Sequence, residues 1–239
     1  MKGLLRVTHY LSGGYWIILL DFGFPVLISL LPVNPPNIST CMMFVAYISI
    51  FTGMMPVREH EATSVSRWKS YIKTMPYTRR QQVDAKFLYS LLTVIPAVLA
   101  ALLLLPYFQL RNPNMMNEFP YAPPAAFLML MYAALTAAAI LQMTAFLLPL
   151  FFIRRGGIGT YLAGTAVGAP FVCIYIGILA YLSHHLYLCK WEPVSQTALM
   201  IPFLLLVPAV ICFALSWLYT RRAYCRRRRK KVTAPPIVS

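Results

Sequence analysis

Acidic side chains are scarce in this sequence. Asp and Glu together number 6 among 239 residues, whereas Lys and Arg number 21, and charged residues make up only 11% of the chain. Soluble domains carry about 25% charged residues, so an ordinary water-soluble fold is excluded. Hydrophobic residues account for 59% of the sequence, and the mean hydropathy is +0.66. The composition therefore indicates a protein that folds in a membrane.

The sequence also lacks the motifs that mark common catalytic sites. It contains no G-x-x-x-x-G-K-[ST] phosphate-binding loop, no H-E-x-x-H zinc motif and no G-x-S-x-G nucleophile motif. Without a phosphate loop, the chain has no recognisable means of hydrolysing ATP. We therefore expect no enzymatic activity and no bound cofactor.

Neither the cysteines nor the histidines form a recognisable ligand set. The 5 cysteines lack the paired spacing of a disulfide framework or a zinc site. His184, His185, Cys189 and Glu192 gather near one predicted helix end, but their spacing matches no standard metal site. Histidines are common at membrane interfaces, and no metal is expected here.

Six apolar stretches are long enough to cross a bilayer. A helix needs about 20 mainly apolar residues to span the hydrocarbon core, and backbone groups in lipid must hydrogen-bond within their own segment. The expected fold is therefore all-α, with six transmembrane helices at roughly residues 15–31, 38–55, 87–105, 124–152, 160–182 and 197–219. The expected organisation is a membrane domain over residues 1–220, including a loop at 57–86, and a basic tail at 221–239.

The basic residues alternate between the predicted loops. If the N-terminus is cytoplasmic, all of the 21 Lys and Arg residues except Arg111 and Lys190 lie on the cytoplasmic side, as the positive-inside rule requires. Both termini are then cytoplasmic. The excess charge thus reflects topology, and nucleic acid is not an expected partner. The tail suits anionic membrane lipids, but a stop-transfer and orientation signal is the preferred interpretation.

Two features inside the spans suggest special roles. A carboxylate such as Asp21 near a helix centre costs about 2.5–3.5 kcal/mol on insertion scales and usually faces a partner or water. Asp21 is therefore either a hydrogen-bonded packing residue or a residue that lines a substrate path, and the sequence favours neither. Gly164 and Gly168 are four apart, a spacing that lets membrane helices approach closely, either within one chain or between chains.

The loop at 57–86 contains the most elaborate polar sequence of the chain. Val65, Trp68 and Ile72 recur at helical spacing, which predicts a short amphipathic helix that ends before Pro76. Thr78 and Gln81 fit a capping box, which predicts a second helix running through Lys86 into the third span. Arg80 and Asp84 are four apart on that helix. Periodicity alone slightly favours an interfacial helix resting on lipid; the alternative is a docking element joined to a membrane span.

At this loop the sequence resembles the ABC-2 type transporter permeases, and in particular a small six-span bacterial subfamily. The shared pattern places Trp and Tyr in a short helix, then Leu or Met before Pro, Ser or Thr before Arg, and Val and Lys leading into the next span. The matching positions here are Trp68, Tyr71, Met75, Pro76, Thr78, Arg79, Val83 and Lys86. The six-span layout and the opening MKGLLR are also similar.

The resemblance implies a membrane subunit that couples ATP hydrolysis by a separate ABC ATPase subunit to export. In such a permease the loop carries a coupling helix that fits a groove on the ATPase, the partner binds the ATP, and the permease works as a homo- or heterodimer in the bacterial plasma membrane. The residues that would contact the ATPase are Trp68, Tyr71, Ile72, Met75, Pro76 and Arg79.

The spans contain few fixed charges apart from Asp21, which favours an apolar or amphipathic substrate. The alternative function is that of a membrane-embedded interaction or regulatory protein without transport activity.

Overall fold

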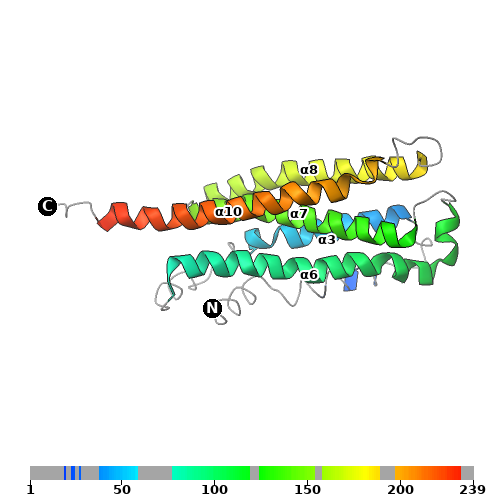
Figure 1. Ribbon diagram of the computed structural model, residues 1–239, viewed down its shortest axis with the longest axis horizontal. Coiled ribbons are helices and arrows are strands. Elements are labelled where there is room, and N and C mark those ends of the chain that lie inside the picture. Colours follow the sequence, from blue (N-terminus) through cyan, green and yellow to red (C-terminus); the bar gives the residue numbers. More distant parts are fainter. Residues whose placement is uncertain are drawn as a thin grey trace.

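The computed structural model describes residues 38–58, 77–118, 124–153, 158–188 and 197–232, together with Leu19, Gly23, Phe24 and Leu27. Within these residues every regular element is helical. The order along the chain is α3 (Ile38–Gly53), α6 (Arg79–Arg111), the 3₁₀ helix η1 (Pro113–Glu118), α7 (Ala125–Ile153), α8 (Ile158–Leu188) and α10 (Ile201–Val232). The α-helices lie side by side as one elongated bundle (Figure 1).

Five of the described helical segments are long and apolar enough to cross a membrane. They are Thr40–Arg58, Arg79–Arg111, Ala125–Phe152, Leu162–Leu182 and Ile201–Tyr224. Each coincides with one of the spans predicted from the sequence, so the all-α, multi-pass prediction is confirmed for these five. The first predicted span, at 15–31, lies outside the described residues except for four of its members. One of these, Phe24, stacks on Tyr47 of α3 with ring centroids 4.7 Å apart.

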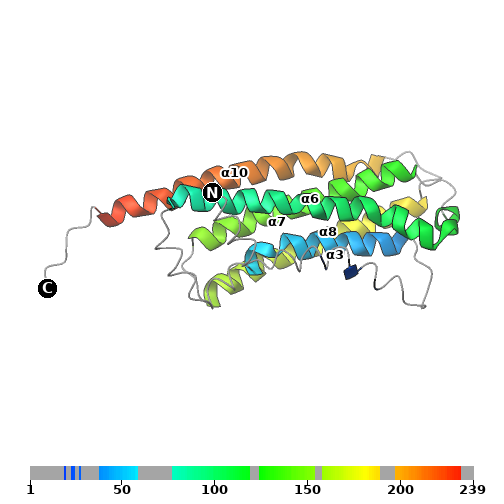
Figure 2. The ribbon, with the colours of Figure 1, turned by 90° about the horizontal axis from the view of Figure 1, so that it is seen from below.

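Helix α7 forms the centre of the bundle. It packs against α3, α6, α8 and α10, and 61% of its span is buried. Helix α7 is apolar on all sides, so each of its faces can pack on a neighbouring helix. Among the described helices, the others follow one another around α7 in the order α8, α3, α6 and α10, each packed on the next. These four helices do not form a closed ring around α7, because α8 and α10 make little contact with each other (Figure 2).

The two longest of the described helices, α6 and α10, are longer than a bilayer requires. Helix α6 has 33 residues and α10 has 32, which corresponds to about 50 Å each against a hydrocarbon core of about 30 Å. The sequence-based boundary at residue 220 does not end α10, which continues as helix through Arg221 to Val232. Arg, Lys and Ala are good helix formers, and the segment contains neither Gly nor Pro until Pro235. Part of each helix therefore extends beyond the membrane.

The start of α6 confirms the predicted capping box. Thr78 Oγ1 accepts a hydrogen bond from the Gln81 backbone N–H at 3.3 Å, and Gln81 Oε1 accepts one from the Thr78 N–H at 2.9 Å. These bonds satisfy two backbone donors that the first turn of a helix would otherwise leave unpaired. Helix α6 thus begins at a defined residue, Arg79, directly after its N-cap Thr78.

A buried polar contact joins α3 to α8 deep in the bundle. Ser49 Oγ donates to the Val45 carbonyl at 2.6 Å and lies 2.9 Å from the Tyr175 hydroxyl. A serine hydroxyl has a single proton to donate, so the Tyr175 hydroxyl is the donor to Ser49.

Gly53 allows the end of α3 to approach α7 closely, since a Cβ built there would lie 2.7 Å from Met143 Sδ.

Candidate functional site at the base of α6 and α10

The structure describes only some of the residues singled out in the sequence. Arg79, Gly164 and Gly168 lie within the described helices. The other candidate residues lie outside the described residues; these are Asp21, Trp68, Tyr71, Ile72, Met75 and Pro76. Their roles remain predictions. The described structure nevertheless includes the point where the loop joins the bundle, and a polar cluster lies there.

The first turn of α6 contacts the end of α10. The Arg79 guanidinium carbon lies 5.1 Å from the centre of the Tyr224 ring, and Arg79 Nη1 lies 3.5 Å from the Tyr224 carbonyl oxygen. A cation above an aromatic face is stabilised by about 0.5–1 kcal/mol at partly exposed sites. The residue that follows the loop thus already has a partner within the chain.

Asp84, one turn further along α6, makes the strongest link to α10. Its Oδ1 accepts a hydrogen bond from Trp217 Nε1 at 2.8 Å, and its Oδ2 lies 3.4 Å from Arg221 Nη2. The Asp84 side chain is only 19% exposed. Trp217 and Arg221 are four apart on α10, so a single carboxylate contacts two consecutive turns of that helix.

A hydrophobic cluster that is rich in aromatic side chains lies beside this carboxylate. The buried residues of the cluster are Val83 and Phe87 of α6 and Leu148 of α7, and the partly buried residues packed on them are Phe152, Phe213, Trp217 and Tyr224. Lys86 Nζ lies 5.3 Å from the Phe152 ring centre, which links α6 to the end of α7 as well. We call this set, from Arg79 to Phe87 together with Phe152, Trp217, Arg221 and Tyr224, the basal cluster.

The basal cluster joins three helices through specific side-chain contacts. Three helices meet in it through buried rings, one short hydrogen bond to a carboxylate and one ion pair. No group of three or more potential metal ligands occurs within the described part of the chain. The start of α6 is thus tied directly to the last part of α10 by a partly buried carboxylate.

Sequence reasoning missed the α10 side of this cluster. Sequence patterns indicated no link between Trp217 or Arg221 and the loop, and Asp84 was noted only for its spacing from Arg80 in its own helix. The available signal was that Asp84 is the single carboxylate among the basic residues from Arg67 to Lys86, because a carboxylate that becomes partly buried needs a cationic or N–H partner.

Gly164 and Gly168 both face other helices of the same chain. A Cβ at Gly164 would lie 3.1 Å from Phe151 Cζ at the end of α7, and a Cβ at Gly168 would lie 3.4 Å from Met54 Sδ just after α3. The absence of a side chain at Gly164 thus lets α8 approach the end of α7. These contacts are of the within-chain kind that the glycine spacing allows.

Comparison with known protein families gives one match over most of the chain. The model of the ABC-2 family transporter proteins matches residues 7–224. The chain belongs to the ABC-2 transporter family. This ABC-2 permease is therefore a multi-pass membrane protein and a transport component that is not itself catalytic, in a family whose members generally work with an ABC ATPase subunit. No curated protein and no solved structure gives a match.

Membership also covers the region of the basal cluster. The matched segment includes the loop at 57–86, all of α6 and α10 as far as Tyr224. The sequence resemblance noted at this loop is thereby confirmed at the level of the family. The part of α10 beyond Tyr224 lies outside the match.

Proposed function

We propose that this chain is the membrane subunit of an ABC-2 exporter and that the basal cluster passes the motion of a separate ATPase subunit to the membrane helices. The observation that carries the proposal is the capped, uninterrupted start of α6, held to α10 by Asp84. The ATPase binds the ATP. It contacts the short amphipathic helix through Trp68, Tyr71, Ile72, Met75 and Pro76.

The physical argument is one of stiffness. An α-helix does not absorb a displacement along its axis unless it contains a break, and the segment from Arg79 to Lys86 has none. A push on the loop is thus delivered to the third span and, through the Asp84 contacts, to α10. Arg79 marks the junction, since it follows the loop and contacts Tyr224.

The same reasoning defines the transport cycle in outline. Coupling between two sites requires an element with two arrangements that both sites can bias. Here the ATPase biases the base of α6, and the substrate biases the spans. A second copy of the chain or a paralogue completes the permease, and the exported molecule is apolar or amphipathic because the described spans have no ionised side chain in their central parts.

Co-purification tests the proposal. The chain is co-expressed in turn with each separate ABC ATPase subunit of the source genome, and the ATPase retained with the permease is measured. Trp68→Ala combined with Tyr71→Ala should remove most of it. Trp191→Ala is the matched control, because Trp191 is predicted on the opposite side of the membrane. Full retention of the ATPase after residues 65–79 are scrambled in a correctly inserted chain would refute the proposal.

A further inference from the structure

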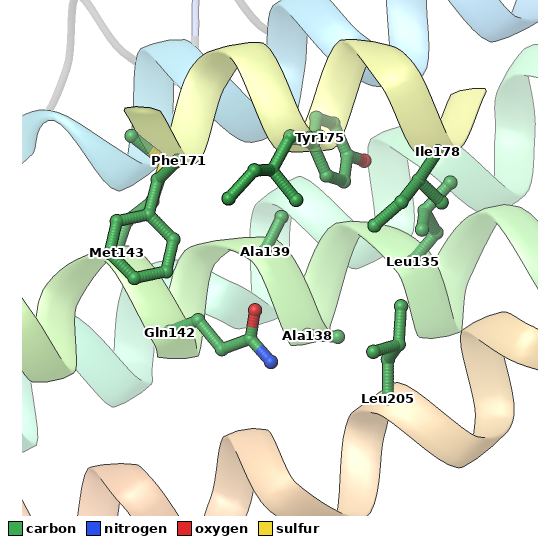
Figure 3. A pocket seen from close by; sticks show the side chains of 10 residues that line it. Leu135, Ala138, Ala139, Gln142, Met143, Phe171, Tyr175, Ile178 and Leu205 are labelled. Atoms are coloured by element: carbon green, nitrogen blue, oxygen red, sulfur yellow. The ribbon is translucent and has the colours of Figure 1, made fainter. Parts of the chain in front are cut away.

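A cavity of about 100 Å³ lies between α7, α8 and α10 (Figure 3). Residues of α7 form its floor, residues of α8 form one wall, and Leu205 of α10 contributes to the other. The lining residues are Leu135, Ala138, Ala139, Gln142, Met143, Phe171, Ile174, Tyr175, Ile178 and Leu205. The cavity lies where α8 and α10 leave α7 uncovered, so it opens sideways, toward the lipid.

The exposure of α8 and α10 indicates that the cavity opens toward lipid. In the most apolar part of each helix, 24% of α8 and 11% of α10 are buried, whereas 61% of α7 is buried. Ile174 on α8 and Val207 on α10 are among the large apolar side chains left exposed. In a membrane such surfaces face hydrocarbon. A molecule dissolved in the bilayer can therefore reach the cavity without passing through water.

Gln142 provides the free hydrogen-bonding group of this cavity. Its amide has no hydrogen-bond partner among the described residues, and in Figure 3 it extends from α7 toward α10. The other polar side chain of the lining, Tyr175, already donates its hydroxyl proton to Ser49. Leaving an amide unpaired in an apolar medium costs about 2–7 kcal/mol, depending on the reference state. An occupant that pairs with Gln142 would remove that cost.

The depth of Gln142 restricts which molecules can pair with it. It lies in the span Ala125–Phe152, roughly 15 Å along the helix from Phe152 and roughly 26 Å from Ala125. This places it about 5 Å from the middle of a hydrocarbon core about 30 Å thick. The ester groups of ordinary phospholipids lie at the edge of that core, so the occupant must carry its polar group deeper.

The size and lining of the cavity define the remaining chemistry. An engineered apolar cavity of about 150 Å³ holds benzene, whereas complete small-molecule sites span about 300–1,000 Å³. A cavity of about 100 Å³ thus accepts one end of a molecule, and the rest lies along the opening between α8 and α10. No charged side chain lines the cavity, which excludes an ionised group.

We propose that this cavity is a lateral binding site for a neutral amphipathic molecule that enters from the bilayer, carrying an alkyl chain and one amide or carbonyl group. Gln142 pairs with the amide or carbonyl, and the apolar side chains of α7 and α8 hold the adjoining alkyl segment. An amide is the best match, because the Gln142 side chain both donates and accepts. The inference rests on the membrane placement of the bundle and is independent of coupling to an ATPase.

Photolabelling of the purified chain, without any ATPase, tests this site. The probe is a long-chain fatty amide with a diazirine on its alkyl chain and a terminal alkyne, used in phosphatidylcholine nanodiscs. Labelled peptides are located by mass spectrometry. We expect adducts on α7, α8 and α10 around the cavity that unlabelled oleamide displaces. In Gln142→Leu the oleamide concentration for half displacement should rise about fivefold, the loss of one net hydrogen bond.

Two further variants make the result specific. Gln109→Leu, the same exchange on α6 and away from the cavity, should leave labelling unchanged. Ile178→Trp should reduce it by filling the cavity. Equal competition in the wild type and in Gln142→Leu would overturn the proposal, since it would indicate ordinary lipid contact. A dimer that dissociates in Gln142→Leu, with no competition by oleamide, would also overturn it and assign the cavity to a second copy.

Discussion

Replacement of Asp84 by alanine should loosen the base of the bundle more than any other single change of charge there. The change removes the acceptor of the Trp217 N–H bond, which is 2.8 Å long, and the partner of Arg221, which is 3.4 Å away. It also leaves a partly buried indole N–H without a partner. A hydrogen bond to a charged group contributes about 1.5–3 kcal/mol to stability.

The two contacts should contribute unequally. The Arg221 side chain is 39% exposed, and an ion pair at such exposure contributes about 0–1 kcal/mol, less at high salt. We therefore expect Asp84→Ala to lower the free energy of unfolding by about 2–3 kcal/mol. Asp84→Asn, which keeps an acceptor for Trp217, should lower it by about 1 kcal/mol. The indole contact, and not the ion pair, should dominate.

Double-mutant cycles measure this difference directly. Equilibrium unfolding by SDS in mixed micelles, followed by circular dichroism, gives the free energy for Asp84→Ala, Trp217→Phe, Arg221→Gln and the paired variants. The coupling energy of Asp84 with Trp217 should be about 1.5 kcal/mol, and that with Arg221 below about 1 kcal/mol and reduced by salt. A larger coupling with Arg221 than with Trp217, or no loss of stability in Asp84→Ala, would refute the reasoning.

Three further predictions can be checked with the same preparation. Gly53→Ala should destabilise the fold by about 1–3 kcal/mol, because the new Cβ would lie 2.7 Å from a methionine sulfur on α7. Gly177→Ala, whose new Cβ would have no atom within 4 Å, should stabilise the fold by up to about 1 kcal/mol. A higher unfolding temperature for Gly53→Ala than for Gly177→Ala would contradict this packing. Tyr132→Phe should be neutral or stabilising, since its buried hydroxyl has no hydrogen-bond partner, whereas Tyr175→Phe should cost about 1 kcal/mol through its lost contact with α3; equal effects would show that both hydroxyls are equally paired. Pro76→Ala should leave insertion and ATP hydrolysis by the complex intact while export stops, and normal export would exclude Pro76 from coupling.

Local sequence was sufficient wherever the controlling interactions are local. Hydropathy located the five described spans, because crossing a bilayer demands a minimum apolar length in each segment separately. The capping box was equally predictable, since Thr78 and Gln81 are three residues apart and bond each other directly. The end of α10 was less predictable from the sequence, because the fall in hydropathy after Tyr219 marks the membrane surface and does not end the helix.

The sequence could predict only the part of the candidate site that lies on α6, next to the loop, and not the part that lies on α10. Asp84 and Trp217 are 133 positions apart, and their contact depends on how α6 and α10 are rotated about their axes. In soluble proteins an apolar face sets that rotation. Here α7 is apolar on every side, so composition does not indicate which of its residues faces which neighbour. The same ambiguity concealed Gln142, whose importance depends on α8 and α10 failing to meet over it.

Among the described helices, the packing around α7 is weakest between α8 and α10, so this is where the bundle should change shape most easily. Polar contacts join α3 to α8 through Ser49 and Tyr175, and α6 to α10 through Asp84. Among the described helices, α8 and α10 pack on each other far less than either packs on its other neighbours. A change in the distance between those two helices would therefore disturb little packing, whereas α3 and α6 on the opposite side pack on each other. Separation of α8 from α10 would expose more of the α7 surface around Gln142 and leave the packing of α3 on α6 unchanged.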